Sequence, residues 1–150
     1  MNITMRPVGY VKSSVTRRKD TSWGGETADI VMEEEFAAGL TGLEDFSHAL
    51  IIYHLNEARY DREQHLQRRP QNRGDMPLTG IFAQRGKDRP NAIGVTAVEI
   101  VAVAEGTLTV RGLDAIDGTP VLDVKPYYPA YDKREASVPE WVTRLMAHYF

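Results

Sequence analysis

Apolar residues recur along this chain in short runs, and most of these runs are too short for a helix. The clearest is IGVTAVEIVAV at residues 93–103, where β-branched side chains dominate. The run ALIIY at residues 49–53 is typical of a buried strand. Shorter runs with strand character lie at residues 4–11, 30–32, 78–83, 107–113 and 118–125. The pattern predicts roughly six or seven short strands.

The sequence between these apolar runs gives less clear indications of secondary structure. Residues 28–36 fit either a strand or a helix, with Ile30-Val31-Met32 favouring a strand, and residues 40–46 fit a turn or a single helical turn. Residues 57–77 are polar without a clear period, which predicts a long loop. A helix is predicted only for residues 138–149, where Pro139 lies near the start and apolar residues share one face: Trp141, Val142, Leu145, Met146 and Tyr149.

Short strands without an alternating strand–helix rhythm indicate a mainly β protein. We expect a small closed or nearly closed β-barrel with a C-terminal helix. No internal repeat or change of composition divides the 150 residues, so residues 1–150 are interpreted as a single domain.

Composition narrows the function classes. The hydrophobic fraction of 42% is enough for a core, and no run of 18 apolar residues is present. The first ten residues, MNITMRPVGY, lack the pattern of a signal peptide, so a cytoplasmic protein is expected. The absence of cysteine excludes disulfides, thiolate catalysis and cysteine-ligated metals.

Charge is unevenly distributed along the chain. The formal net charge is −3, yet between residues 59 and 89 eight cations outnumber four acids, for a local net charge of 8 − 4 = +4. A local basic surface can hold a phosphate-bearing partner, and it can equally be a solvated loop. The eight cations are Arg59, Arg62, Arg68, Arg69, Arg73, Arg85, Lys87 and Arg89.

Several familiar motifs fail on spacing or chemistry. In the segment GIFAQRGKD, five residues separate the two glycines instead of four, and Asp88 stands where a P-loop needs Ser or Thr. No G-x-G-x-x-G follows a strand, so a Rossmann site is unsupported. The four histidines form no helical pair with a nearby acid, so no metal site is predicted. Ser47 and His48 are adjacent, and strand geometry is expected to point them to opposite faces, which excludes a Ser–His nucleophile.

Three aspartates within ten residues form the most unusual polar stretch. Asp117 in the turn before Gly118 fits an ordinary backbone cap. Asp123 and Lys125 have the same parity within an apolar strand, so they are expected to share a face. Such a charged pair indicates either an exposed edge or a polar cavity.

Two long runs make the sequence resemble a known family. These are GIFAQRGKDRPNAIGVTAVEIVAV from Gly80 and GLDAIDGTPVLDVKPYYP from Gly112, preceded by PVGYVKS from Pro7 and LEDFSH from Leu43. They are similar, in order and spacing, to the signature of the TsaA-like (TrmO) family. The resemblance covers residues 5–132, and it leaves the predicted helix at residues 138–149 outside the family core.

The resemblance implies a β-barrel methyltransferase that binds S-adenosylmethionine, commonly as a homodimer. The activity best known for the family is methylation of N6 of N6-threonylcarbamoyladenosine beside the anticodon of tRNA. Two alternatives stay open: methylation of a small molecule, and a non-catalytic barrel that senses the cofactor. Some members have a C-terminal extension with a D-P-R-P-x-Y motif that this sequence lacks, which leaves the acceptor open.

The resemblance also assigns site residues. Cofactor contacts are expected from Trp23, Gly24, Asn56, Glu57, Arg85, Val95, Leu113, Asp114, Ala115 and Ile116. The chemistry of methyl transfer, in which the attacking nitrogen loses a proton, leads us to expect catalytic roles, in substrate contact or proton handling, for Asp117, Asp123 and Tyr127. Substrate contacts are expected from Arg89, Asn91 and Lys125.

Chemistry suggests how two of these side chains act. The Arg85 guanidinium suits the cofactor carboxylate through a bidentate fork. Arg89 either contacts substrate or braces its own loop through backbone carbonyls. Gln84, Gly86 and Ala92 depart from the family signature, and Asn56 stands where some members have histidine, which leaves loop rigidity and adenine contacts open.

Overall fold

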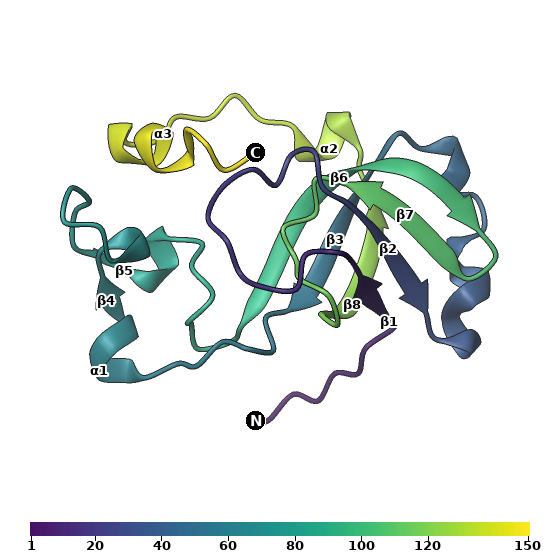
Figure 1. Ribbon diagram of the computed structural model, residues 1–150, viewed down its shortest axis with the longest axis horizontal. Coiled ribbons are helices and arrows are strands. Elements are labelled where there is room, and N and C mark those ends of the chain that lie inside the picture. Colours follow the sequence, from purple (N-terminus) through teal and green to yellow (C-terminus); the bar gives the residue numbers. More distant parts are fainter.

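Six antiparallel strands close into a barrel in the computed structural model, which describes residues 1–150 (Figure 1). The order around the barrel is β1-β2-β7-β6-β3-β8, and β8 pairs with β1 to close it. The predicted mainly β barrel is therefore confirmed. The strands are β1 (Gly9–Lys12), β2 (Thr27–Met32), β3 (His48–His54), β6 (Ile93–Ala104), β7 (Thr107–Arg111) and β8 (Pro120–Pro126).

Alternating side chains fill the barrel interior. In β3, Ala49, Ile51 and Tyr53 point inward and are at most 3% exposed. Facing strands contribute in the same way, because successive strand residues point to opposite faces. The core consists of Val11, Ala28, Ile30, Leu40, Leu43, Ala49, Ile51, Tyr53, Val98, Leu108, Val110, Leu113, Ala115 and Val121.

Short helices close one end of the barrel. They are η1 (Glu34–Leu40) and η2 (Leu43–Asp45), and they lie together at the right-hand side of Figure 1. The turn predicted at residues 40–46 is confirmed by η2. Residues 28–36, which fitted strand or helix, divide between β2 and η1.

Residues 57–92 form a separate lobe outside the barrel, at the left of Figure 1. The prediction of an irregular loop over residues 57–77 was wrong in part, because local hydrogen bonds order it. Gln84, which is 9% exposed, donates from its side-chain amide to Arg68 O at 2.7 Å and to Thr79 Oγ1 at 2.8 Å. The elements of this lobe are α1 (Arg62–His65), β4 (Gln67–Arg68), η3 (Pro70–Asn72), β5 (Thr79–Gly80) and η4 (Ile81–Ala83).

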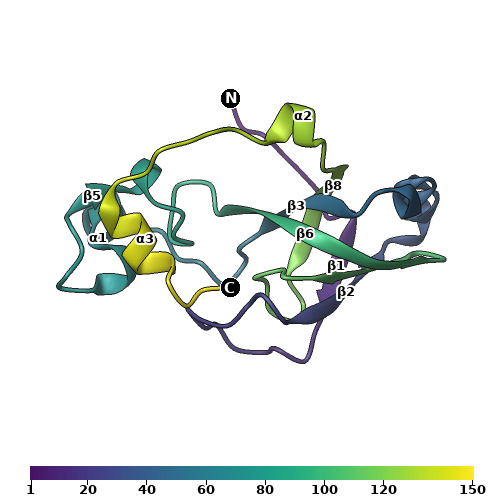
Figure 2. The same cartoon turned by 90° about the horizontal axis from the view of Figure 1, so that it is seen from above.

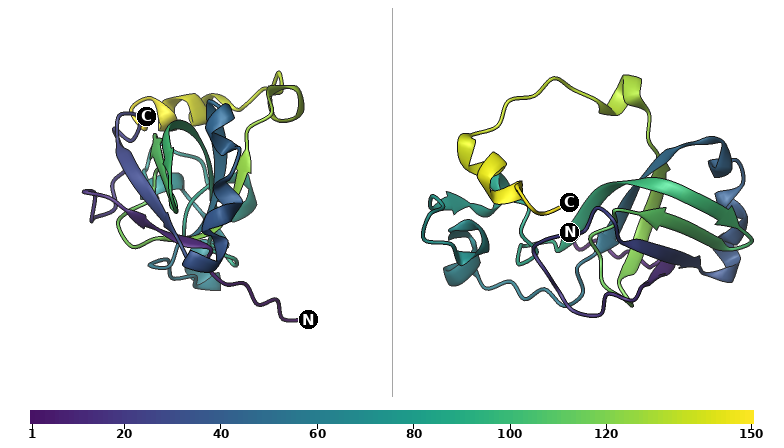
Figure 3. Two further views of the ribbon diagram at one scale, coloured as in Figure 1. Left: turned by 90° about the vertical axis from the view of Figure 1, so that its right-hand side faces the viewer. Right: turned by 45° about the horizontal axis from the view of Figure 1, so that its top comes forward.

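The C-terminal helix packs against this lobe and not against the barrel wall. After α2 (Pro129–Asp132), residues 133–139 arc across to α3 (Glu140–Met146), as Figures 2 and 3 show. Arg144 of α3 binds Asp75 Oδ2 at 2.9 Å and Asp75 O at 2.8 Å. Hydrogen bonds from Arg73, with Arg144 adding to them, lower the pKa of Asp75 to about 2.

Three predicted elements are shorter than expected. Residues 4–8 have no regular structure before β1, and the strand predicted at residues 78–83 is only the two-residue β5 followed by η4. The helix predicted at residues 138–149 is α3, with Pro139 directly before its first residue. None of the helices is both long and apolar enough to cross a membrane.

Candidate functional site

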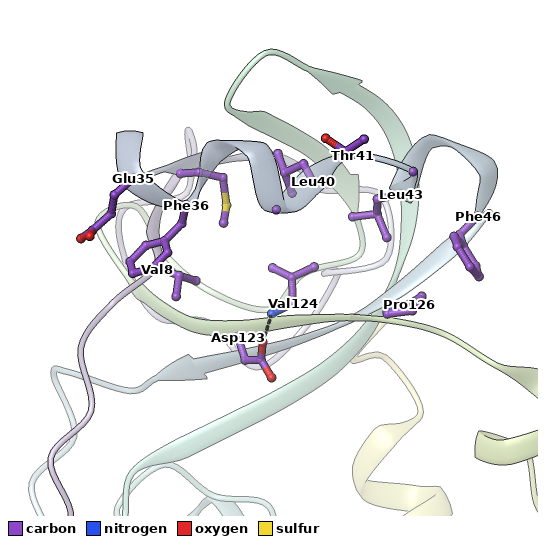
Figure 4. A pocket seen from close by; sticks show the side chains of 13 residues that line it. Val8, Glu35, Phe36, Leu40, Thr41, Leu43, Phe46, Asp123, Val124 and Pro126 are labelled. Carbon is purple, nitrogen blue, oxygen red and sulfur yellow. Dashed lines mark hydrogen bonds between the residues drawn. The ribbon is translucent and has the colours of Figure 1, made fainter.

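The two ends of the barrel differ in chemistry. At the η1–η2 end, apolar side chains surround a cavity of about 540 Å³ (Figure 4). Its charged lining residues are Glu35 and Asp123, and no cationic side chain lines it. Glu35 is already paired with Arg6 at 3.2 Å. This cavity therefore offers no partner for a carboxylate or a phosphate.

At the opposite end, hydroxyl groups converge on the carboxylate of Asp114. Tyr53 donates to Asp114 Oδ1 at 2.9 Å, and Thr96 donates to the same oxygen. Tyr149 donates to Asp114 Oδ2 at 2.5 Å. Tyr53 comes from β3, Thr96 from β6, Asp114 from the loop after β7 and Tyr149 from the segment after α3, so four distant parts of the chain meet here.

The phenols at this centre are held in their neutral, donating form. Burial, followed by the charge of Asp114, raises the pKa of Tyr53 above its ordinary value. The same two causes raise the pKa of Tyr149. The Arg85 guanidinium acts on the pKa of Tyr53 in the opposite direction. Arg85 also donates to the carbonyl of Val95, the residue next to Thr96 in β6, so a cation lies near this end of the barrel.

Gly94 makes room for Tyr53 beside it in the sheet. The two residues are direct partners in the register of β3 and β6. A Cβ at position 94 would lie 2.5 Å from Cε2 and Cζ of the Tyr53 ring. Sequence reasoning missed Tyr53 and Thr96, although a glycine within a β-branched run is the signal of such a close approach. Tyr149 gave no signal beyond its place on a helix face.

Removing the Tyr53 hydroxyl is expected to weaken this end of the barrel. The variant Tyr53→Phe leaves Asp114 Oδ1 with Thr96 alone, and we expect its free energy of unfolding to fall by about 1–2 kcal/mol. Urea denaturation measures it. The matched control Tyr131→Phe removes the hydroxyl of a side chain that is 74% exposed and should leave stability unchanged. Equal stability of both variants would contradict a structural role for the Tyr53 hydroxyl.

The loop that carries Asp114 is anchored on both sides. Leu113 and Ala115 are 1% and 4% exposed and belong to the core, and the Ile116 carbonyl accepts from Thr119 Oγ1 at 2.7 Å. Asp117 caps a backbone amide of a distant segment, because its Oδ1 accepts from the Ser13 N–H at 3.0 Å. The carboxylate thus has a backbone-capping contact, although not within its own turn. Its catalytic role stays a prediction.

The other residues expected around the cofactor lie around the same end. Arg85 donates to Val95 O at 2.5 Å, so these two are direct neighbours. Trp23 is buried, and Lys19 lies over its ring at 4.8 Å. Glu57 pairs with Arg18 of the loop that carries Trp23 at 3.8 Å, and Asn56 is exposed beside it.

The structure does not bring the three residues with predicted catalytic roles together. A bulge in β8 between the partners of Ile52 and Tyr53 turns Asp123 to the outer face, where it pairs with Lys125 at 2.8 Å. Both side chains are about half exposed, so the exposed-face alternative for this pair is the observed one. Tyr127 lies beside His48, at the far end of β3 from Tyr53, about 16 Å along the strand. Roles for Asp123, Lys125 and Tyr127 stay predictions.

The basic region between residues 59 and 89 is partly neutralised inside the lobe, because three of its eight cations, Arg68, Arg73 and Lys87, form ion pairs with Asp75 or Asp88. Asp88 accepts from Lys87 at 2.7 Å and from the Arg59 N–H at 2.9 Å, and Arg68 lies 3.6 Å away. Burial alone would raise the pKa of Asp88, but these donors lower it below its ordinary value. Arg89 donates to Gln84 O at 3.0 Å and Gly86 O at 3.3 Å, which is the bracing role considered for it.

The structure contradicts the prediction made for Ser47 and His48, and it gives the position of Asn91. Ser47 Oγ lies 2.7 Å from His48 Nδ1, so the expectation that these side chains point apart was wrong. The reason is that β3 begins at His48, which leaves Ser47 outside the strand. Both side chains are exposed at the surface. Asn91 is exposed in the turn before β6, and its carbonyl accepts from the Ile93 N–H at 2.7 Å.

The fold is a closed, six-stranded antiparallel barrel with an acidic centre, built on the loop after β7, at one end of its strands. The family model described as tRNA-methyltransferase O N-terminal domain matches residues 10–133. The chain belongs to this TrmO family.

Relatives and solved structures agree with this membership. An S-adenosyl-L-methionine-binding protein of Archaeoglobus fulgidus is 36% identical over 132 residues, which cover 85% of this chain and 91% of the relative. The tRNA (adenine(37)-N6)-methyltransferase of Mus musculus is 33% identical over 87% of this chain and 32% of its own length. A crystal structure of TrmO from Pseudomonas aeruginosa superposes with a TM-score of 0.71 at 28% identity, covering 92% of this chain and 62% of that chain. The chain therefore spans about three fifths of the solved TrmO chain.

Proposed function

We propose that this chain is an S-adenosylmethionine-dependent methyltransferase that modifies adenosine in tRNA. The finer proposal is that the acceptor is N6 of N6-threonylcarbamoyladenosine beside the anticodon. The observation that carries the proposal is that an acidic acceptor, Asp114, and a cation, Arg85, lie at the same end of a TrmO-family barrel: Asp114 accepts from Thr96, and Arg85 donates to the carbonyl of the neighbouring Val95.

The chemistry of the cofactor fits these two groups. Its ribose hydroxyls and amine are hydrogen-bond donors, which suit the Asp114 carboxylate. Its carboxylate suits the Arg85 guanidinium, which is exposed and bonded within the chain only to a backbone carbonyl. When bound, S-adenosylmethionine supplies the methyl group, and the residues of this chain position it and exclude water. We propose that Trp23, Gly24, Asn56, Glu57 and the loop Leu113–Ile116 complete the site.

A second set of cations is available for tRNA phosphates. Arg17, Arg59 and Arg62 are exposed and form no ion pair within the chain. The Arg18–Glu57 ion pair, at 3.8 Å, joins the loop that carries Arg17 to the segment that leads to Arg59 and Arg62. Phosphate contacts make affinity fall steeply with salt. Binding of tRNA by this chain should therefore weaken strongly between low and physiological ionic strength.

The methyl acceptor is tested by nucleoside analysis. Incubating the protein with S-adenosylmethionine and tRNA from cells that lack this activity should add one methyl group to N6-threonylcarbamoyladenosine, seen by mass spectrometry. Transcribed tRNA without that modification is the matched control and should stay unmethylated. Methylation of a different nucleoside would overturn the finer proposal only, whereas cofactor binding without methylation of any tRNA would favour a small-molecule acceptor or a sensor.

We also propose that the protein forms a homodimer. Its accessible surface is 9,926 Å², against about 7,700 Å² for a compact monomer of this mass. Part of the excess is apolar: Phe82 and Leu78 in the lobe are 78% and 61% exposed, and Val95 on the outer face of β6 is 42% exposed. A second copy would cover such a surface. Sedimentation equilibrium should give twice the mass of 16.9 kDa.

A further inference from the structure

The segment after α3 occupies part of the proposed cofactor site. We call residues 148–150 the strap. The Ser22 N–H donates to His148 O and the Trp23 N–H donates to Tyr149 O, each at 2.8 Å. The Tyr149 hydroxyl donates to Asp114 Oδ2 at 2.5 Å. The strap is therefore bonded to both sides of the site, to the loop of Trp23 and to the loop of Asp114.

The backbone of the strap also packs closely against Gly24. A Cβ at Gly24 would lie 2.9 Å from the carbonyl carbon of Phe150, so the strap backbone rests directly on this glycine. A backbone N–H has one hydrogen to donate, and that of Trp23 is used by the strap. A ligand that needs the Trp23 N–H, the face of Gly24 or the second oxygen of Asp114 meets the strap in its place.

The anchoring of the strap is light compared with that of the barrel. No residue of α3 is fully buried, its apolar residues Trp141, Val142 and Leu145 are half-buried, and Arg144 bonds to Asp75 of the lobe. Phe150 is 64% exposed. Segments with few buried apolar contacts open at the low end of the range of local unfolding free energies. The strap can thus lift while the barrel stays folded.

We propose that the strap competes with S-adenosylmethionine for the site around Asp114, and that it must lift before the cofactor binds, with Tyr149 as the latch. The inference rests on the proposed location of the cofactor site. It adds a control element to that site: a ligand or partner that releases Tyr149 would raise the affinity for the cofactor. The apparent affinity is reduced by the fraction of molecules with the strap closed.

The test compares two tyrosine variants by calorimetric titration with S-adenosylmethionine. Tyr149→Phe removes the latch and is expected to bind the cofactor about tenfold more tightly than the wild type. Tyr131→Phe, in a side chain that is 74% exposed, should match the wild type. If the wild type binds the cofactor and Tyr149→Phe binds it equally or more weakly, the proposal that the strap competes with the cofactor is overturned, and the proposed cofactor site is not. No binding by either protein would overturn the proposed cofactor site as well.

A second readout needs no ligand. The chain has two tryptophans, so Trp141→Phe leaves Trp23 as the single indole reporter. Trp23 is 3% exposed, and its backbone N–H donates to Tyr149 O of the strap. In this background, adding Tyr149→Phe should shift Trp23 emission to longer wavelength, while a thermal unfolding curve confirms that the barrel is folded. Identical spectra with and without the Tyr149 hydroxyl would contradict the latch.

Discussion

Replacing Gly94 by alanine should lower the free energy of unfolding by about 3 kcal/mol and the melting temperature by about 10 °C. The new Cβ would lie 2.5 Å from two ring carbons of Tyr53 and 2.9 Å from its hydroxyl oxygen. Tyr53 is 3% exposed in the barrel core, so the ring cannot move without repacking its neighbours. The shift would also draw the hydroxyl away from Asp114.

The matched control for this change is Gly39→Ala. Gly39 lies in η1 at the other end of the barrel, and a Cβ there meets no atom within 4 Å. Its stability should stay the same or rise by about 0.5 kcal/mol, because alanine reduces the entropy of the unfolded chain. Calorimetric unfolding of the two variants measures the difference. A Gly94→Ala protein as stable as Gly39→Ala would show that Tyr53 does not need the space above Gly94.

Arg85 and Arg89 lie four residues apart in one loop, and replacing each by alanine should have different effects. One substitution should lower the affinity for the cofactor, and the other should lower the stability of the fold. Arg85→Ala removes the exposed cation that is bonded to Val95 O next to Thr96, and we expect affinity for S-adenosylmethionine to fall about 30- to 100-fold, with stability nearly unchanged. Arg89→Ala removes donors to two backbone carbonyls, and we expect stability to fall by about 1–2 kcal/mol. Titration calorimetry and urea denaturation of both variants test the division.

The opposite pattern would reverse the two roles. If Arg89→Ala lost cofactor affinity and Arg85→Ala lost only stability, Arg89 would be the ligand and Arg85 the brace. Equal losses in both measurements would mean that the loop acts as one rigid unit. The structure favours the division, because Arg89 is half-buried against its own loop and Arg85 is exposed.

The barrel could be predicted from the sequence because its strands carry local signals. The β-branched run at 93–103 and the apolar run at 49–53 became the neighbouring strands β6 and β3. The lobe gave no such signal, because it depends on single contacts between residues far apart in the sequence, such as Gln84 with Arg68 and Asp88 with Arg59. Polar contacts of this kind have no period to detect.

The site was predictable only in part for a related reason. Resemblance pointed to Asp114 and Arg85, and the structure places both at one end of the barrel. It gave no sign that Tyr53, Thr96 and Tyr149 would converge on the same carboxylate. Parity correctly placed Asp123 and Lys125 on one face, but a bulge in β8 decides which face that is. A bulge shifts every later side chain by one position and has no clear signature in this run.

The central claim is that S-adenosylmethionine binds beside Asp114 and not in the apolar cavity of about 540 Å³ next to η1 and η2. Photolabelling the full chain with radioactive S-adenosylmethionine, followed by fragmentation mass spectrometry to residue level, tests it directly. We predict label on residues 22–25 or 113–116, reduced by Arg85→Ala and unaffected by Asp45→Asn, a change at an exposed residue of η2. Label on the cavity lining, such as Phe36, Phe46 or Val124, would contradict the account.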